Sequence, residues 1–283
     1  MSRVAQRLAA ARAQGRAALI GYLPAGFPDL ATSRALLTGM VAGGVDVVEV
    51  GLPYSDPVLD GPTVAAAADI ALRAGTRTAD VLAATATLAG QGAAALVMTY
   101  WNPVERYGVG RFAADLAAAG GSGLITPDLT PDEAGDWLVA SQAHELDRVF
   151  LLAPSSTTRR IELTVAACRG FVYAASVMGV TGTRAVTSAA APQLVARIRA
   201  RTDLPVCVGL GVSTPEQAAE VAGYADGVIV GSAFVRAVLD AAGPRQAVSA
   251  VTRLAEELAA GVRSGNESVA TGVARNPSGV SEH

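Results

Sequence analysis

Residues 45–62 read VDVVEVGLPYSDPVLDGP, a short run of strand-forming residues followed by a loop rich in proline, glycine and aspartate. The run Val45–Val50 is apolar on both faces of the strand that it predicts. Strands buried on both faces are typical of parallel sheets covered by helices, whereas half-exposed antiparallel strands alternate apolar and polar residues. The stretch therefore predicts a parallel strand of an α/β fold, with a long loop at its carboxyl end.

Eight runs of this kind alternate with alanine-rich segments of helical character. The predicted strands are Ala18–Leu23, Val45–Val50, Ala95–Tyr100, Gly123–Thr126, Arg148–Ala153, Phe171–Ala174, Pro205–Gly209 and Gly227–Val230. Eight strand-then-helix units in about 250 residues predict a single closed (β/α)8 barrel, the TIM barrel. A doubly wound open sheet is the alternative, and it normally has fewer strands.

Three of the intervening helices carry boundary signals. Asp29 precedes LATSRALLTGMVAGG, where Gly43 and Gly44 supply a stop. Thr130 and Thr214 are each followed by a proline and an acid, the pattern of an N-cap with proline at the first helical position. We therefore expect helices to begin directly after Asp29, Thr130 and Thr214.

The two ends of the chain predict different structures. In MSRVAQRLAAARAQGR at the N-terminus, Val4, Leu8 and Ala11 mark one face of a helix, and a strand signal follows at once. An organellar transit peptide is the alternative, because the segment is rich in arginine and free of acids. We expect a helix that caps the barrel, a barrel domain over residues 1–263, and a disordered tail over residues 264–283, where SGNESVATGVARNPSGVSEH has no sustained periodicity.

Composition excludes several kinds of chemistry. All 22 cationic side chains are arginine, so neither a Schiff-base lysine nor the lysine of a nucleotide-hydrolase phosphate loop exists. The two histidines, His144 and His283, leave no Ser-His-Asp relay and no histidine-rich zinc site. Cys168 and Cys207 lie in apolar contexts without metal-ligand spacing, so we expect buried thiols in a reducing cytoplasm and no bound metal.

Charge and hydropathy limit the kinds of partner that the chain can bind. The formal net charge is −3 and no basic stripe is present, which argues against nucleic acid. No uninterrupted apolar run approaches the roughly 18 residues of a membrane span. Charged residues make up 17% of the chain, below the roughly 25% usual for soluble domains. The low fraction predicts extensive burial or a face that meets a protein partner.

Two acids stand where a barrel places its active site, at the carboxyl ends of the strands. Glu49 lies inside a hydrophobic run, and burial without a partner raises the pKa of a carboxyl group, which can then take and return a proton near neutral pH. A structural ion pair is the alternative for Glu49. Asp60 lies in the loop PYSDPVLDGP, where it or Asp56 either contacts substrate or caps the next helix at Thr63.

Glycine turns at the ends of the last three strands predict phosphate binding. They are Gly179–Gly182, Gly209–Gly211 and Gly231–Ser232. Loops after the last two strands are the recurrent phosphate site of barrel enzymes, because glycine lets backbone N–H groups approach an anion. The residues alone therefore predict a barrel that acts on a phosphorylated small molecule through carboxylate acid–base catalysis.

Six blocks of the sequence resemble the tryptophan synthase alpha subunit family. They are VEVGLPYSDPVLDGP, NPVERYG, PDL, VYAASVMGVTGTR, VGLGVSTPEQ and DGVIVGSAF, in that order between Ala17 and Phe234. The resemblance implies retro-aldol cleavage of indole-3-glycerol phosphate to indole and glyceraldehyde 3-phosphate, in the last step of tryptophan biosynthesis. It also implies a beta subunit that receives the indole in an α2β2 heterotetramer, with pyridoxal phosphate on that partner and no cofactor in this chain.

The resemblance assigns site residues by matching motifs. Glu49 matches the general acid–base, Asp60 the aspartate that holds the indole N–H, and Tyr173 a tyrosine near the glycerol-phosphate chain. The other matched positions are Gly182, Gly211, Gly231 and Ser232 in the phosphate turns, and Tyr22, Tyr100, Ile125 and Thr181 in or over the indole pocket. A place in the hydrophobic core is the alternative for the second group. The family's beta-subunit surface corresponds to residues 53–62 and 102–107.

Three rival functions stay open at this point. A stand-alone indole-3-glycerol-phosphate lyase that releases free indole would share every catalytic residue. A catalytically silent regulatory subunit would have no need of both Glu49 and Asp60. A phosphosugar isomerase or epimerase on the same barrel rests on the glycine turns alone and lacks the histidine or lysine that such enzymes usually employ.

Overall fold

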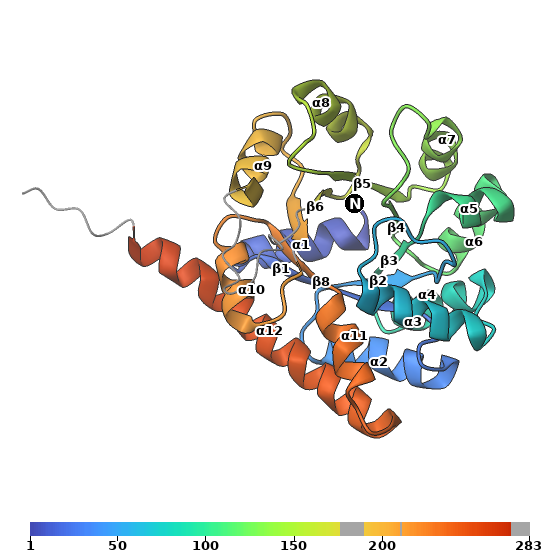
Figure 1. Ribbon diagram of the computed structural model, residues 1–283. Coiled ribbons are helices and arrows are strands. Elements are labelled where there is room, and N and C mark those ends of the chain that lie inside the picture. Colours follow the sequence, from blue (N-terminus) through green and yellow to red (C-terminus); the bar gives the residue numbers. More distant parts are fainter. Residues whose placement is uncertain (176–189, 210, 273–283) are drawn as a thin grey trace, which may run out of the picture.

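The computed structural model describes residues 1–175, 190–209 and 211–272, and for residues 266–272 the backbone alone. The described strands form a closed parallel barrel in sequential order, which β1 closes by pairing with β8 (Figure 1). The strands are β1 Ala18–Pro24, β2 Val47–Gly51, β3 Ala94–Met98, β4 Gly123–Thr126, β5 Asp147–Leu152, β6 Val172–Ala175, β7 Val206–Gly209 and β8 Gly227–Val230. The predicted TIM barrel is confirmed, and the open-sheet alternative is wrong.

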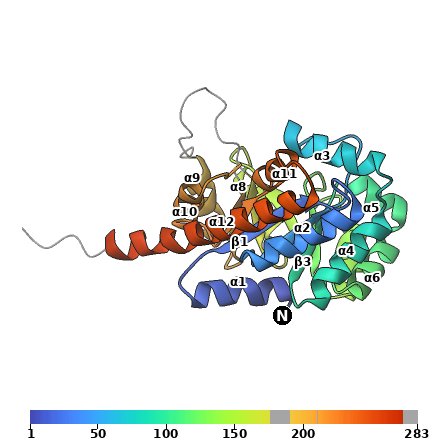
Figure 2. The same cartoon turned by 90° about the horizontal axis from the view of Figure 1, so that it is seen from below.

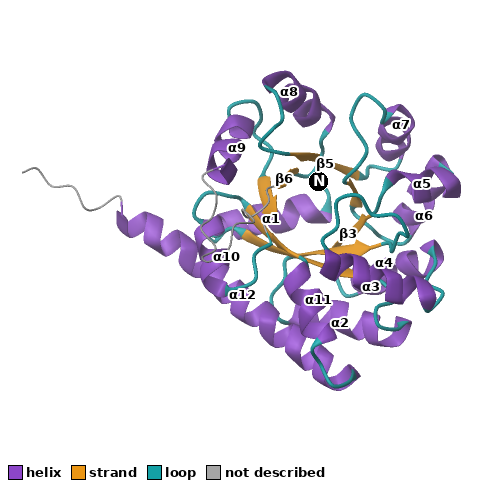
Figure 3. Ribbon diagram, viewed as in Figure 1, coloured by secondary structure: helices purple, strands orange, loops and turns teal. Residues whose placement is uncertain are grey.

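Helices surround the barrel on its outer side (Figures 1 and 3). They are α2 Leu30–Ala42, α3 Pro62–Arg73, α4 Thr78–Gly90, α5 Trp101–Tyr107, α6 Val109–Ala118, α7 Gly135–Ala143, α8 Thr158–Ala167, α9 Ala190–Arg199, α10 Pro215–Ala222, α11 Ser232–Leu239 and α12 Pro244–Gly272. Their apolar faces pack on the outward side chains of the strands, such as Val48 and Val50 of β2. Within the described ranges, no helix is long and apolar enough to cross a membrane.

The helix α1, Arg3–Ala13, covers the amino-terminal end of the barrel (Figure 2). Alternate residues of each strand point inward, and the resulting inner cluster contains Ile20, Val47 and Leu96. Val4, Leu8 and Ala11 of α1 belong to the same cluster and are at most 4% exposed. The predicted capping helix is confirmed, because the face that periodicity marks is the face that seals the barrel interior.

Two of the three predicted helix starts are confirmed and one is wrong. Asp29 caps α2 by accepting a hydrogen bond from Thr32 N, and Thr214 caps α10 in a capping box with Gln217. Thr130 caps no helix, since α7 begins only at Gly135. The Thr130 hydroxyl instead donates to the carboxylate of Glu133 within a turn. The proline and acid after Thr130 thus form a turn rather than the first turn of a helix.

The expectation of disorder from residue 264 is wrong for its first part, because α12 continues to Gly272. Two glycines in this helix let it approach α10 closely. A Cβ at Gly261 would overlap the carbonyl oxygen of Pro215, and one at Gly265 would overlap that of Ala219. Close backbone packing therefore holds α12 against α10 as far as Gly265. Residues 273–283 lie outside the described ranges.

Candidate active site

One pocket of about 410 Å³ lies at the carboxyl end of the barrel and gathers most of the predicted site residues. It is lined by Tyr22, Glu49, Asp60, Tyr173, Gly211, Gly231 and Ser232 among others. These residues come from β1, β2 and β6, from the loops after β2, β7 and β8, and from the first position of α11. The barrel therefore joins segments that are more than 200 residues apart in the sequence, from Tyr22 to Ser232.

Glu49 lies on β2 with its side chain inside the barrel. Its strand register places it between Tyr22 of β1 and Leu96 of β3. The residue is 1% exposed, and neither of its carboxyl oxygens has a hydrogen-bond partner among the described residues. Burial raises the pKa of the carboxyl group from 4.5 to about 8. No structural ion pair therefore forms within the described barrel, and the group is a neutral acid near pH 7 that can donate and then accept a proton.

Asp60 lies in the loop between β2 and α3 and is half-buried at the pocket wall. Burial raises the pKa of its carboxyl group, and a hydrogen bond from Tyr100 opposes that rise. The Tyr100 hydroxyl also accepts a hydrogen bond of 3.0 Å from Leu59 N. The capping alternative is wrong, since α3 begins after Gly61 without a side-chain cap. Tyr100 thus holds the loop so that the Asp60 carboxyl faces the pocket.

Tyr22 and Tyr173 place phenol rings beside the two acids. Burial raises the pKa of both hydroxyls, and the nearby Glu49 and Asp60 raise it further. Two glycines make room for them. A Cβ on Gly51 would lie 2.6 Å from the Tyr22 oxygen, and one on Gly209 would overlap the hydroxyl of Tyr173. The sequence placed Gly209 in a turn that was predicted to bind phosphate. In the structure this glycine also leaves room for a tyrosine to pack.

The pocket end formed by the loops after β7 and β8 suits an anion. Gly211 has a φ of +75°, and no atom of the described residues lies within 4 Å of the position that a Cβ would occupy there. Gly231 is the N-cap of α11 and supplies no side-chain cap. The first N–H groups of a helix have no intrahelical partner, so those of α11, beginning at Ser232, are available to a bound oxyanion. Thr181 and Gly182 lie outside the described residues.

Two predicted pocket residues lie elsewhere. Ile125 is fully buried in the inner cluster of the barrel, and Tyr100 borders the pocket from behind Asp60, in a small adjoining cavity. The pocket has apolar walls that motif reasoning missed, namely Met98, Leu151 and Ile229. Met98 and Leu151 lie two residues beyond Leu96 and Val149 of the inner cluster, and Ile229 belongs to that cluster. The period of two along a strand is therefore the signal that could have found them.

The raised pKa of Glu49 makes stability depend on pH. A carboxyl group whose pKa rises from 4.5 unfolded to about 8 folded stabilises the protein at and below pH 4.5, and this contribution is lost as pH rises to about 8. Glu49→Gln is neutral at every pH. We expect wild type to lose about 3 kcal/mol or more of unfolding free energy relative to this variant between pH 5 and 8.5. Urea unfolding at both pH values measures the difference, and parallel profiles would contradict a buried, unpaired Glu49.

Known proteins match nearly the whole chain. The family profile for the tryptophan synthase alpha chain matches residues 8–263. The tryptophan synthase alpha chain of Acidothermus cellulolyticus is 66% identical over 263 residues, which are 93% of this chain and 98% of that protein. The alpha chain of Thermobifida fusca is 62% identical over 266 residues, with the same coverage of 93% and 98%.

Solved structures agree with the sequence matches. A chain of tryptophan synthase from M. tuberculosis has a TM-score of 0.85 at 56% identity, covering 93% of this chain and 99% of that one. The tryptophan synthase alpha subunit of Legionella pneumophila has a TM-score of 0.84 at 30% identity, covering 93% and 98%. The matched region includes the whole pocket with Glu49 and Asp60. The chain therefore belongs to the tryptophan synthase alpha chain family.

Proposed function

We propose that this chain cleaves indole-3-glycerol phosphate to indole and glyceraldehyde 3-phosphate and passes the indole to a beta subunit. The observation that carries the proposal is Glu49, a buried carboxyl group on the floor of the pocket with no partner among the described residues. The apolar walls suit an indole ring, and the backbone at Gly211, Gly231 and Ser232 suits a phosphate. Acid–base chemistry and phosphate binding thus use different residues of one site.

Glu49 and Asp60 divide the chemistry between them. Glu49 donates its proton to indole C3, and the ring becomes a cation with positive charge on its nitrogen. The Asp60 carboxylate accepts a hydrogen bond from the indole N–H and stabilises that charge. The Glu49 carboxylate, now ionised, then takes the proton of the adjacent glycerol hydroxyl. The aldehyde forms as the carbon–carbon bond breaks, and that bond returns its electron pair to the ring. The substrate itself is the electron sink, so we propose no cofactor for this chain, with pyridoxal phosphate on the beta subunit.

We propose that the loop at residues 53–62 and the helix α5 form the surface for the beta subunit. Val58 and Leu59 are 75% and 61% exposed, an apolar pair that a partner can cover. The Asn102 side chain donates a 3.1 Å hydrogen bond to the Tyr54 hydroxyl, which joins the loop to α5. Since the same loop carries Asp60, a partner that orders it also positions a catalytic group. An α2β2 heterotetramer follows from the family.

Partner-dependent turnover tests this function. Indole release from indole-3-glycerol phosphate is measured for the isolated chain and after addition of the beta subunit. We expect activation of at least about tenfold, the effect of about 1.4 kcal/mol on the barrier. Equal rates with and without the partner would favour the stand-alone lyase. No indole in either case would contradict the reaction.

The free thiols of Cys168 and Cys207 support a reducing cytoplasm as the location of this protein.

A further inference from the structure

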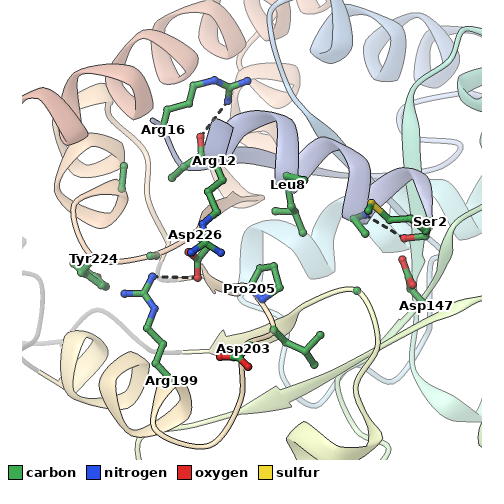
Figure 4. A pocket seen from close by; sticks show the side chains of 18 of the residues that line it. Ser2, Leu8, Arg12, Arg16, Asp147, Arg199, Asp203, Pro205, Tyr224 and Asp226 are labelled. Carbon is green, nitrogen blue, oxygen red and sulfur yellow. Dashed lines mark hydrogen bonds and ion pairs between the residues drawn. The ribbon is translucent and has the colours of Figure 1, made fainter. Parts of the chain in front are cut away.

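Aspartates at the two ends of the barrel make different kinds of contact. At the amino-terminal end, a cavity of about 540 Å³ lies behind α1 (Figure 4). In its wall the Asp226 carboxylate pairs with Arg199 at 3.1 Å, as Figure 4 shows, and accepts a hydrogen bond of 2.9 Å from Val206 N. These contacts hold α9 and the starts of β7 and β8 together, at the other end of the barrel from the pocket that contains Glu49.

At the carboxyl end of the barrel, the Asp128 carboxylate holds the start of α5. Asp128 lies in the loop after β4, and its two oxygens accept hydrogen bonds of 3.0 and 3.1 Å from Trp101 N. Trp101 is the first residue of α5, and the N-cap residue before it, Tyr100, supplies no side-chain cap. The first N–H groups of a helix have no intrahelical partner and favour a negative charge, so Asp128 supplies from another loop the acceptor that this helix lacks.

The same contact fixes the backbone on one side of Tyr100. On the other side, Thr99 N donates a hydrogen bond of 3.1 Å to the Ile125 carbonyl oxygen of β4. The peptide that follows Tyr100 contains Trp101 N, which Asp128 binds. The Tyr100 side chain between these two anchors is 5% exposed. The strand β4 and the loop after it therefore determine where the Tyr100 hydroxyl lies.

The Tyr100 hydroxyl is the point at which this support reaches the loop that carries Asp60. It accepts a hydrogen bond of 3.0 Å from Leu59 N and also makes a hydrogen bond to the Asp60 carboxylate. The side chains of Val58 and Leu59 are exposed, so burial contributes little to holding this part of the loop. The position of Asp60 therefore depends on a hydroxyl group whose own position Asp128 helps to fix.

We propose that Asp128 is a positioning residue for Asp60, acting through the start of α5 and the Tyr100 hydroxyl. This role rests on the proposed function, in which Asp60 stabilises the positive charge on the indole ring. Without the Asp128 carboxylate, the peptide between Tyr100 and Trp101 loses an anchor, and the hydroxyl shifts relative to Leu59 N. The phosphate turns lie in the loops after β7 and β8, so phosphate binding does not depend on this contact.

Kinetics of the full chain without the beta subunit test this role. Asp128→Ala should lower kcat for indole release about tenfold, because even a small displacement of a catalytic group slows a reaction, and should leave the affinity for glycerol 3-phosphate unchanged. Asp128→Asn should keep kcat within about threefold of wild type, since asparagine is an equally good acceptor at the start of a helix. Asp132→Ala is the matched control and should keep wild-type turnover, because Asp132 is an exposed aspartate of the same loop that pairs with Arg160 of α8.

A double variant tests the route. If Asp128 acts through Tyr100, Asp128→Ala should add less than about twofold to the loss that Tyr100→Phe causes by itself. Losses that multiply in the double variant would overturn the route through Tyr100. A large loss of glycerol 3-phosphate affinity in Asp128→Ala, or an equal loss of turnover in Asp132→Ala, would overturn the positioning role.

Amide hydrogen exchange gives a readout that does not depend on the reaction. The Leu59 amide should exchange at least about fivefold faster in Asp128→Ala than in wild type, and at the wild-type rate in Asp132→Ala. If wild type forms no indole, the proposed function is wrong, whereas faster Leu59 exchange in Asp128→Ala would still support the link from Asp128 to the loop. Unchanged Leu59 exchange, or a kcat of Asp128→Ala equal to that of wild type, would overturn the proposal.

Discussion

Glu49→Gln is expected to abolish most indole formation, with kcat reduced about 10²–10⁴-fold, the usual contribution of a general acid–base group. Glutamine keeps the shape of the side chain and removes the proton that, in the proposed reaction, passes to indole C3. Both oxygens of Glu49 are buried and have no partner among the described residues, so the change breaks no hydrogen bond there. Single-turnover measurement of indole release with saturating beta subunit isolates the chemical step.

Two controls separate chemistry from folding. Glu257→Gln changes an exposed glutamate of α12 in the same way and should keep wild-type turnover. In wild type, kcat/KM should fall as pH rises through about 8, because the first step needs the protonated carboxyl group. Turnover of Glu49→Gln within tenfold of wild type would show that another group moves the proton.

Asp60→Asn is expected to lower kcat about 10²-fold while leaving the affinity for glycerol 3-phosphate unchanged. The amide oxygen can still accept the indole N–H, but it cannot stabilise the positive charge that develops on the ring. The residue lies at the pocket wall, in the loop after β2, and not in the loops after β7 and β8. Kinetics of the isolated chain and calorimetry with glycerol 3-phosphate measure the two effects.

Asp56→Asn is the matched control, because this aspartate lies in the same loop, and its carboxylate accepts a hydrogen bond from the neighbouring Ser55 hydroxyl. In the isolated chain it should retain nearly all activity. A similar loss in both variants would mean that the negative charge of the loop matters rather than the position of Asp60. A large loss of glycerol 3-phosphate affinity in Asp60→Asn would place this carboxyl group near the phosphate instead.

Local sequence patterns predicted much of the fold. The strands Gly123–Thr126 and Gly227–Val230 have the predicted bounds, because short apolar runs between turn residues suit buried parallel strands. The cap at Thr214 was also predictable, since the proline and the acceptor residues lie within four positions. The same pattern failed at Thr130, where the chain forms a turn before α7. A cap motif does not show which way the chain runs after it.

The sequence predicted which residues form the candidate site, but it did not predict the surroundings of each side chain. A carboxyl group within a hydrophobic run suggested Glu49, but only the strand register and the enclosed barrel show that neither oxygen finds a partner among the described residues. Ile125 matched a pocket position and lies in the core, because its place along β4 puts it below the pocket floor. Gly209 leaves space for Tyr173, a residue of another strand, which no turn motif can indicate.

The sequence by itself determined the strand and helix order, the exclusion of lysine chemistry, and the two acids within and after β2. Those features depend on residue type and on neighbours a few positions away. Only the tertiary structure decided the raised pKa of Glu49, the continuation of α12 against α10, and the cavity behind α1. Desolvation, close packing and enclosed volume depend on which distant segments meet, and the barrel brings together segments from both ends of the chain.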